Sequence, residues 1–307
     1  MVTDAVASLN SKPKPSWLFV RLAALRAFSL PVSVLPVVAA VAAAVPFSKW
    51  NWPVLIASSL GAGLLHLTGN LLNDYFDFRS GVDHREEGDE NRPGRQLVKG
   101  QLRPKDILAE AMLCLMLAGV LTAYLIWQCG PDLLWFGLAA GVSLYIYTGP
   151  PLALKYHALG EALIFLTFGP ILLLGAAYAQ THQLELSALL VSLPVGLATT
   201  AILVGNNVRD RDEDRSAGIK TLSRVIGHNG LRALYVTLVI LSVIGLAAMA
   251  AVGAAPRFLL ASPLLLVLLA GPLKAVIKDE RLSDIDAQTA RFETILLAMI
   301  IVVFAMR

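Results

Sequence analysis

Nine long apolar stretches divide this chain, and they leave little room for any fold other than a bundle of membrane-spanning helices. The stretches lie near residues 17–45, 53–78, 106–129, 132–148, 157–180, 184–208, 229–252, 256–276 and 287–306. Each approaches the roughly 20 residues that an α-helix needs to cross a hydrocarbon core of about 30 Å. Because 56% of the residues are hydrophobic and only 15% are charged, the expected solvent is the bilayer. The sequence predicts an all-α, polytopic membrane protein with nine transmembrane helices.

The start of the chain differs from the rest. Residues 1–16, MVTDAVASLNSKPKPS, are polar and contain proline, and they lack the basic start and apolar core of a signal peptide. We expect a disordered tail over 1–16 and a single transmembrane domain over 17–307. Cys114 and Cys129 belong to one apolar stretch, with no second pair at metal-ligand spacing, so we interpret them as small buried residues.

Basic residues gather on one side of the predicted bundle. If the N-terminus and every second connection are cytoplasmic, that side holds 22 of the 25 Lys and Arg, and only Lys49, Arg257 and Arg307 lie outside. The positive-inside rule therefore favours a cytoplasmic N-terminus and an external C-terminus. We expect an integral protein of the inner (cytoplasmic) cell membrane, with the lipid bilayer and no nucleic acid as a partner.

Carboxylates are concentrated in two short stretches on the predicted cytoplasmic side. Seven of the 22 Asp and Glu lie between residues 74 and 90, and four lie between 210 and 214. Within each stretch one Asn and two Asp recur at helical spacing: Asn70, Asp74 and Asp77 in the first, and Asn207, Asp210 and Asp214 in the second. Each triple is therefore expected on one face of its helix. We interpret the motifs at 70–83 and 206–220 as an approximate internal repeat, with the two faces opposed across a central cavity.

These acidic faces predict a cation site. A carboxylate at mid-membrane costs on the order of 2.5 to 3.5 kcal/mol on insertion scales, so the faces need a compensating partner. Oxygen ligands without His or Cys at ligand spacing indicate a hard cation, and Mg²⁺ is the one that usually bridges carboxylates to a substrate's phosphates. Basic residues suited to phosphate lie in the same loops or in the connection between them: Arg79, Arg92, Arg95, Lys155, Arg209, Arg215 and Lys220.

A phosphate clamped at the membrane surface, above an apolar cavity, indicates an amphipathic substrate with a hydrocarbon tail, and a polyprenyl diphosphate fits. Neutralising the departing diphosphate eases cleavage of the allylic C–O bond and gives carbocation character at C1. An electron-rich acceptor then attacks, and burial keeps water from competing with it.

The motif residues resemble the UbiA superfamily of intramembrane aromatic prenyltransferases. NDYFDFRSGVD (73–83) and GNNVRDRDEDRSAGIKTL (205–222) are similar to the family's two aspartate-rich motifs, and WLFVRLAALRAFSLPVSVLP (17–36) is similar to its opening helix. Within the family the details resemble the MenA branch, 1,4-dihydroxy-2-naphthoate polyprenyltransferases, because GVD resembles its KGxD and YTGPPLALKYHALGE (147–161) resembles its YTGGPxxxxYxxLGE. There are departures: GPP replaces GGP, and the loop 84–102 is longer than the simplest MenA loop.

The resemblance implies a UbiA-like fold and a role for each motif residue. Mg²⁺ and the diphosphate would be held by four aspartates: Asp74, Asp77, Asp210 and Asp214. Three asparagines would add oxygen ligands or orient the carboxylates: Asn70, Asn73 and Asn207. Phosphate oxygens would be contacted by Lys155, Arg209 and Lys220. Asp83 would help to assemble the loop or take the acceptor's proton. The Arg-to-Gly spacing of RQLVKGQL favours Arg95 over Arg92 as the motif arginine.

Two further residues are candidates for the acceptor pocket. Tyr147 could line it, although a Tyr at a helix end is more often an interfacial anchor. His66 lies one turn before Asn70 and could contact the acceptor, although a structural role is more common for such a His.

The implied reaction is the transfer of a polyprenyl group to 1,4-dihydroxy-2-naphthoate with loss of CO₂, a step of menaquinone biosynthesis. Other acceptors stay open: 4-hydroxybenzoate, homogentisate or a non-aromatic prenyl chain. A cation-coupled transporter is the alternative from another class. Transporter sites usually lie near the midplane on broken helices, whereas both acidic clusters here are predicted at one membrane face, next to phosphate-binding cations.

Overall fold

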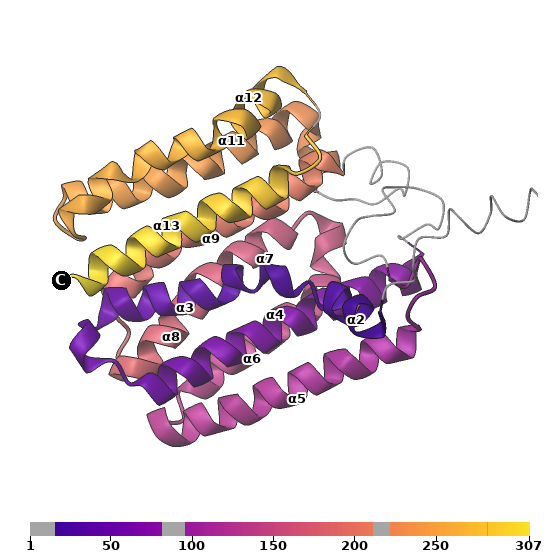
Figure 1. Cartoon of the computed structure of the whole chain (residues 1–307), viewed down its shortest axis with the longest axis horizontal. Coiled ribbons are helices and arrows are strands. Elements are labelled where there is room, and N and C mark those ends of the chain that lie inside the picture. Colours follow the sequence, from indigo (N-terminus) through magenta and orange to yellow (C-terminus); the bar gives the residue numbers. More distant parts are fainter. Residues whose placement is uncertain (1–15, 82–95, 211–221, 281) are drawn as a thin grey trace, which may run out of the picture.

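The computed structural model of the chain describes residues 16–81, 96–210, 222–280 and 282–307. Within these ranges, eight helical segments are long and apolar enough to cross a membrane, and a shorter apolar helix, α6 (Leu133–Thr148), lies between the third and the fourth of them. The predicted all-α membrane fold is confirmed, and the protein is an integral membrane protein. The helices run side by side along one axis (Figure 1).

Five of the eight spans carry a single helix label, and one of them, α11, has a kink near its start. They are α4 (Trp52–Ser80), α5 (Pro104–Cys129), α9 (Leu186–Arg209), α11 (Leu222–Ala251) and α13 (Ile285–Ala305). Helix α11 begins before the predicted start near 229, because a kink at Gly227 joins a preceding helical segment to it.

The other three spans are interrupted. The first consists of α2 (Trp17–Leu25), a 3₁₀ turn (Ala27–Ser29) and α3 (Pro31–Ala44). The second consists of α7 (Gly160–Leu166), a π-helical segment (Thr167–Ile171) and α8 (Leu172–Thr181). The third is a 3₁₀ stretch (Arg257–Leu269) that continues into α12 (Ala270–Lys278). A proline lies at or inside each interruption, where its missing N–H removes one helical hydrogen bond: Pro31, Pro170 and Pro263.

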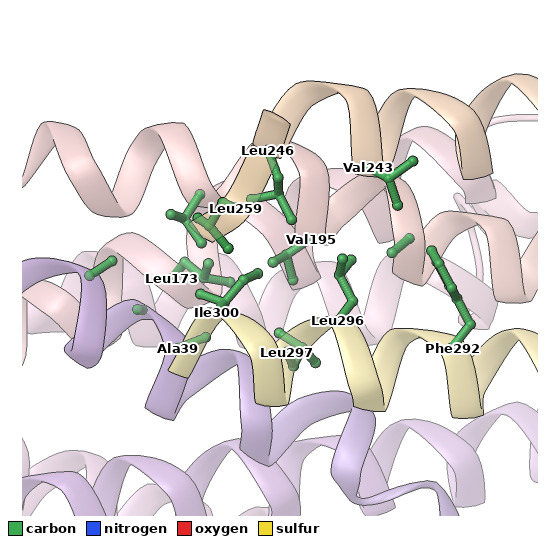
Figure 2. Close-up of a cluster of buried hydrophobic side chains, with 14 of the residues drawn as sticks. Ala39, Leu173, Val195, Val243, Leu246, Leu259, Phe292, Leu296, Leu297 and Ile300 are labelled. Carbon is green, nitrogen blue, oxygen red and sulfur yellow. The ribbon is translucent and has the colours of Figure 1, made fainter. Parts of the chain in front are cut away.

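The larger buried core joins α3, α8, α9, α11, α13 and the Arg257–Leu269 segment. Figure 2 shows Val195 of α9 among Leu246 of α11, Ile300 of α13 and Leu173 of α8. Helix α3 contributes mainly alanines, which are fully buried and let neighbouring helices approach closely. This tight packing fixes α9, which carries the second acidic motif.

A second core holds the first motif. Leu71 and Leu72 of α4 pack with Val20 of α2 and Ile107 of α5, next to the acidic residues of the same helix. Helix α4 ends at Gly81, whose φ of +78° favours glycine over other residues. Figure 1 shows that the C-terminal ends of α4 and α9 lie at the same end of the bundle, opposite the C-terminus of the chain.

Candidate functional site

A cavity of about 870 Å³ opens between α3, α4, α6, α7, α8, α9 and α13. Both acidic faces line it. Helix α4 contributes Asn70, Asn73, Asp74 and Asp77, and the end of α9 contributes Asn206, Asn207, Arg209 and Asp210. The rest of the wall is mainly apolar, so the cavity joins a polar end to a hydrocarbon-like interior.

The first acidic face consists of buried carboxylates paired with cations from other elements. Asp74 is 3% exposed and pairs with Arg26, which follows α2. Asp77 is 6% exposed, accepts a hydrogen bond from Lys155 Nζ at 2.7 Å, and also accepts one from the Tyr156 hydroxyl. Buried charges are stable only when they are paired in this way.

Asn73 ties this arrangement together. Its side-chain amide donates to Asp77 Oδ2 at 3.0 Å, and its carbonyl oxygen accepts from Lys155 Nζ at 3.0 Å. Lys155 comes from a 3₁₀ turn (Leu154–His157) between α6 and α7. The inner connection that was predicted to supply a phosphate-binding cation therefore places that cation on the first motif.

The second face is anchored in the same way. Arg209 Nε donates to Asp210 Oδ1 at 2.7 Å, and the same guanidinium pairs with Asp286 at the start of α13. Asn207 Nδ2 donates to Glu161 Oε1 of α7 at 2.7 Å. Helices α7, α9 and α13 thus meet at this end of the cavity.

Only the first part of the second motif lies on a described helix, and Asp214 lies outside the described residues. Helix α9 ends at Arg209, and Asp210 is its C-cap, with φ −90° and ψ 7°. The carboxylate of Asp210 opposes the helix dipole at this C-terminus. Asp210 nevertheless lines the cavity.

The remaining predicted residues fall in three groups. Tyr147, at the end of α6, lines the cavity. Arg79 is exposed, lies over the Tyr75 ring and is not among the residues that line the cavity. Five candidates, and the alternative arginine, lie outside the described residues: Asp83, Arg92, Arg95, Asp214, Arg215 and Lys220.

Several polar residues of the cavity wall were not predicted as site residues. They are Arg26, Ser29, Glu161, Asp286 and Arg291. Tyr156, whose hydroxyl donates to Asp77, was not predicted either. Arg26 carried a usable signal, since a charge inside an apolar stretch is costly and marks a functional position by default. Glu161 and Asp286 carried a weaker one, because each lies at the edge of an apolar stretch.

The donor set suits a hard cation that is also bound by its substrate. Among the described residues, no three His, Cys, Asp or Glu side chains stand together as a ready metal site. Asp74, Asp77 and Asp210 are instead neutralised by Arg or Lys. Sparse oxygen ligands beside phosphate-binding cations match the way in which Mg²⁺ is held, by one or two carboxylates and the phosphates themselves.

Comparison with known proteins shows which family the sequence resembles. The model of the UbiA prenyltransferase family matches residues 33–302. UbiA prenyltransferase domain-containing protein 1 from Gallus gallus is 32% identical over 250 residues, which cover 79% of this chain and 71% of that protein. The 1,4-dihydroxy-2-naphthoate octaprenyltransferase of Bacillus subtilis is 30% identical over 208 residues, 67% of this chain and 65% of that protein.

Solved structures agree on the fold. A UbiA homologue from Archaeoglobus fulgidus bound to GPP and Mg²⁺ superposes with a TM-score of 0.69 at 15% identity, over 93% of this chain and 99% of that one. The family match spans most of the bundle, including both acidic faces. The chain therefore belongs to the UbiA prenyltransferase family, and it is an intramembrane prenyltransferase.

Proposed function

We propose that this prenyltransferase transfers a polyprenyl group from a polyprenyl diphosphate to 1,4-dihydroxy-2-naphthoate, in a reaction that depends on Mg²⁺. The observation that carries the proposal is the meeting of both acidic faces, with their paired cations, at one end of one apolar cavity. The ring carbon that bears the carboxylate would attack C1 as the C1–O bond breaks. CO₂ then leaves its bonding electron pair in the ring, so the products are a prenylated ring, CO₂ and diphosphate, and no oxidant is needed.

The chain's own residues would hold the diphosphate end. Asp74, Asp77 and Asp210 are the described residues that would bind the metal, with Asp214 as a fourth proposed ligand. When bound, Mg²⁺ would neutralise charge on the leaving diphosphate. The UbiA homologue from Archaeoglobus fulgidus has been solved with Mg²⁺ and GPP and also with Cd²⁺, which supports a divalent ion here.

Cations next to these carboxylates would bind phosphate oxygens. Lys155 and Arg209 each lie within 2.7 Å of a motif carboxylate, and both line the cavity. Once the carboxylates bind the metal, the two side chains can turn to the phosphate without losing a charged partner. We also propose that the remaining predicted site residues act at the diphosphate end: Arg79, Asp83, Arg95, Arg215 and Lys220.

The choice of acceptor rests on the MenA-like motifs and on the name of the Bacillus subtilis relative. Relatives of the UbiA domain-containing protein 1 type are about as similar, so 4-hydroxybenzoate, homogentisate or a prenyl chain are the alternative acceptors. A transporter is no longer favoured, because the chain belongs to a prenyltransferase family.

The test is a product screen. The purified chain in lipid nanodiscs would receive Mg²⁺, one polyprenyl diphosphate and each acceptor in turn, and extracts would be read by mass spectrometry. We expect a product with the mass of the naphthoate plus the prenyl group minus CO₂, and none when EDTA replaces Mg²⁺. A product with another acceptor would replace the naphthoate in the proposal. No product with any acceptor would contradict it.

A further inference from the structure

A second polar group lies deeper in the cavity than the acidic residues. Ser29, His66 and Asn70 all line the cavity, together with Arg26. His66 precedes Asp74 by two turns of α4, so it lies about 12 Å further from the acidic end at 1.5 Å per residue. Its ring contacts Phe168, and the cavity lining also includes the apolar residues Val32 and Ile164. Arg26 also pairs with Asp74, but diphosphate binding does not account for Ser29 and His66.

Hydrogen bonds within the group fix the role of each imidazole nitrogen. The Ser29 hydroxyl has one proton and donates it to the Arg26 carbonyl at 2.8 Å. The 2.8 Å bond between Ser29 Oγ and His66 Nε2 must then be donated by Nε2–H, and Asn70 Nδ2 also donates to Ser29 Oγ at 3.4 Å. In a neutral imidazole with a proton on Nε2, Nδ1 is a hydrogen-bond acceptor.

Two complementary atoms of this group lack partners. His66 Nδ1, an acceptor, and Arg26 Nε, a donor, are both buried without a hydrogen-bond partner among the described residues. Such atoms are rare in native proteins because burial without a partner costs free energy. A ligand with a hydroxyl beside an anionic oxygen would supply both missing partners, a donor for His66 Nδ1 and an acceptor for Arg26 Nε.

We propose that Arg26, Ser29 and His66 form the acceptor-binding end of the cavity, where His66 Nδ1 accepts a hydrogen bond from a ring hydroxyl and Arg26 binds the adjacent carboxylate. The ligand class is an aromatic hydroxy acid, so the inference rests on the proposed function and specifies its acceptor. Both atoms are covered by neighbouring side chains, so binding includes a small rotation of the imidazole or of Phe168, whose ring meets His66 edge-on at 5.6 Å.

This placement would also activate the acceptor. A hydroxyl that donates to Nδ1 releases electron density into the ring, which strengthens the ring carbon as a nucleophile. The hydroxyl proton is shared with Nδ1 and stays on the substrate, so His66 acts by binding and orienting the ring.

Two substitutions separate the nitrogens of His66. His66→Gln places an amide near Nε2 and can still donate to Ser29, but it removes the acceptor at Nδ1. His66→Asn places an amide oxygen near Nδ1 instead. We expect His66→Gln to raise the KM for the naphthoate by about tenfold, which corresponds to the loss of one hydrogen bond. The KM for prenyl diphosphate should stay unchanged. His66→Asn should raise the KM for the naphthoate by less than His66→Gln does. The matched control is His182→Gln, whose ring bonds the Cys129 carbonyl outside the cavity lining; it should leave both constants unchanged.

An acceptor methylated on the hydroxyl next to the carboxylate tests the contact itself. The wild-type chain should lose about tenfold in kcat/KM with this methyl ether, and His66→Gln should lose nothing more. An unchanged naphthoate KM in His66→Gln, or an equal loss with both acceptors, would overturn the inference while leaving the proposed function intact. A wild-type chain that prenylates no aromatic acceptor would overturn both.

Discussion

Asp74 and Asp77 lie one turn apart on α4, and each is held by a cation that is distant in sequence. Arg26 is 48 residues before Asp74, and Lys155 is 78 residues after Asp77. A buried carboxylate that loses its cation is strongly destabilised, whereas one that exchanges it for a metal ion is not. The two ion pairs therefore hold the carboxylates in position for a divalent ion.

Asp74→Ala should abolish transfer. The change removes one proposed metal ligand, and we expect kcat to fall by about a hundredfold or more, as for other groups that stabilise transition-state charge. The measurement is prenyl transfer by the purified variant at saturating Mg²⁺. Asp132→Ala is the matched control, because Asp132 accepts a hydrogen bond from Tyr178 and is not among the cavity-lining residues. Full activity of Asp74→Ala would remove Asp74 from the proposed ligands.

Lys155→Met should act mainly on the donor substrate. Methionine keeps most of the side-chain volume but removes the charge that lies 2.7 Å from Asp77. We expect the KM for prenyl diphosphate to rise by about tenfold, with a smaller change in kcat, since a charge-assisted hydrogen bond to phosphate is lost. Steady-state kinetics would measure both constants. The control is Lys49→Met, because Lys49 is exposed and is not among the cavity-lining residues. An unchanged KM would show that Lys155 serves only to balance Asp77.

The sequence predicted the site only as far as local spacing reaches. Asn70, Asp74 and Asp77 share a helical face, and that pattern is visible without a structure. Arg26, Glu161 and Asp286 reach the site through tertiary contacts between distant helices, which no spacing rule contains.

At the scale of elements, the position of α9 depends on a close approach to the broken helix α7–α8. A Cβ on Gly196 would lie 2.9 Å from the Phe165 carbonyl oxygen and 3.2 Å from Gly169 Cα. Both neighbours are backbone atoms that cannot move without shifting a helix. The π-helical segment therefore fits against α9 only because both positions are glycine.

Gly196→Ala should loosen this contact. The added methyl group forces the helices apart, and we expect a destabilisation of about 1–3 kcal/mol, as for other overpacked positions, with reduced activity because Asn207 and Asp210 follow on the same helix. Thermal unfolding in detergent, monitored by size exclusion, would measure it. Gly119→Ala in α5, where a Cβ meets nothing within 4 Å, is the control and should be neutral. Equal melting temperatures for both variants would contradict this account of the helix contact.

Most elements, but not their irregularities, could be predicted. Length and apolarity were enough to locate the spans, because a helix is the structure that satisfies its own backbone in lipid. The 3₁₀ stretch Arg257–Leu269 was missed, whereas the end of α9 at Arg209 agrees with the predicted stretch 184–208. The 3₁₀ stretch depends on local backbone geometry and packing, which apolarity does not encode.

At the scale of the molecule, the charge distribution predicts which end faces the cytoplasm. We expect the end with both acidic faces to be cytoplasmic and the C-terminus to be external. In a variant whose buried Cys114 and Cys129 are replaced by Ala, a cysteine at position 307 should react with a membrane-impermeant maleimide in intact cells. A cysteine at exposed position 99 should react only after permeabilisation. The opposite pattern would reverse the orientation.

The central claim is that the two acidic faces bind one diphosphate together. Its most direct test is equilibrium binding of a non-hydrolysable prenyl thiodiphosphate to the purified chain in nanodiscs, with and without Mg²⁺, for wild type, Asp74→Ala, Asp210→Ala and the double variant. The account predicts one Mg²⁺-dependent site per chain, lost as fully in either single variant as in the double variant. Binding that persists when one face is removed, or losses that simply add, would contradict it.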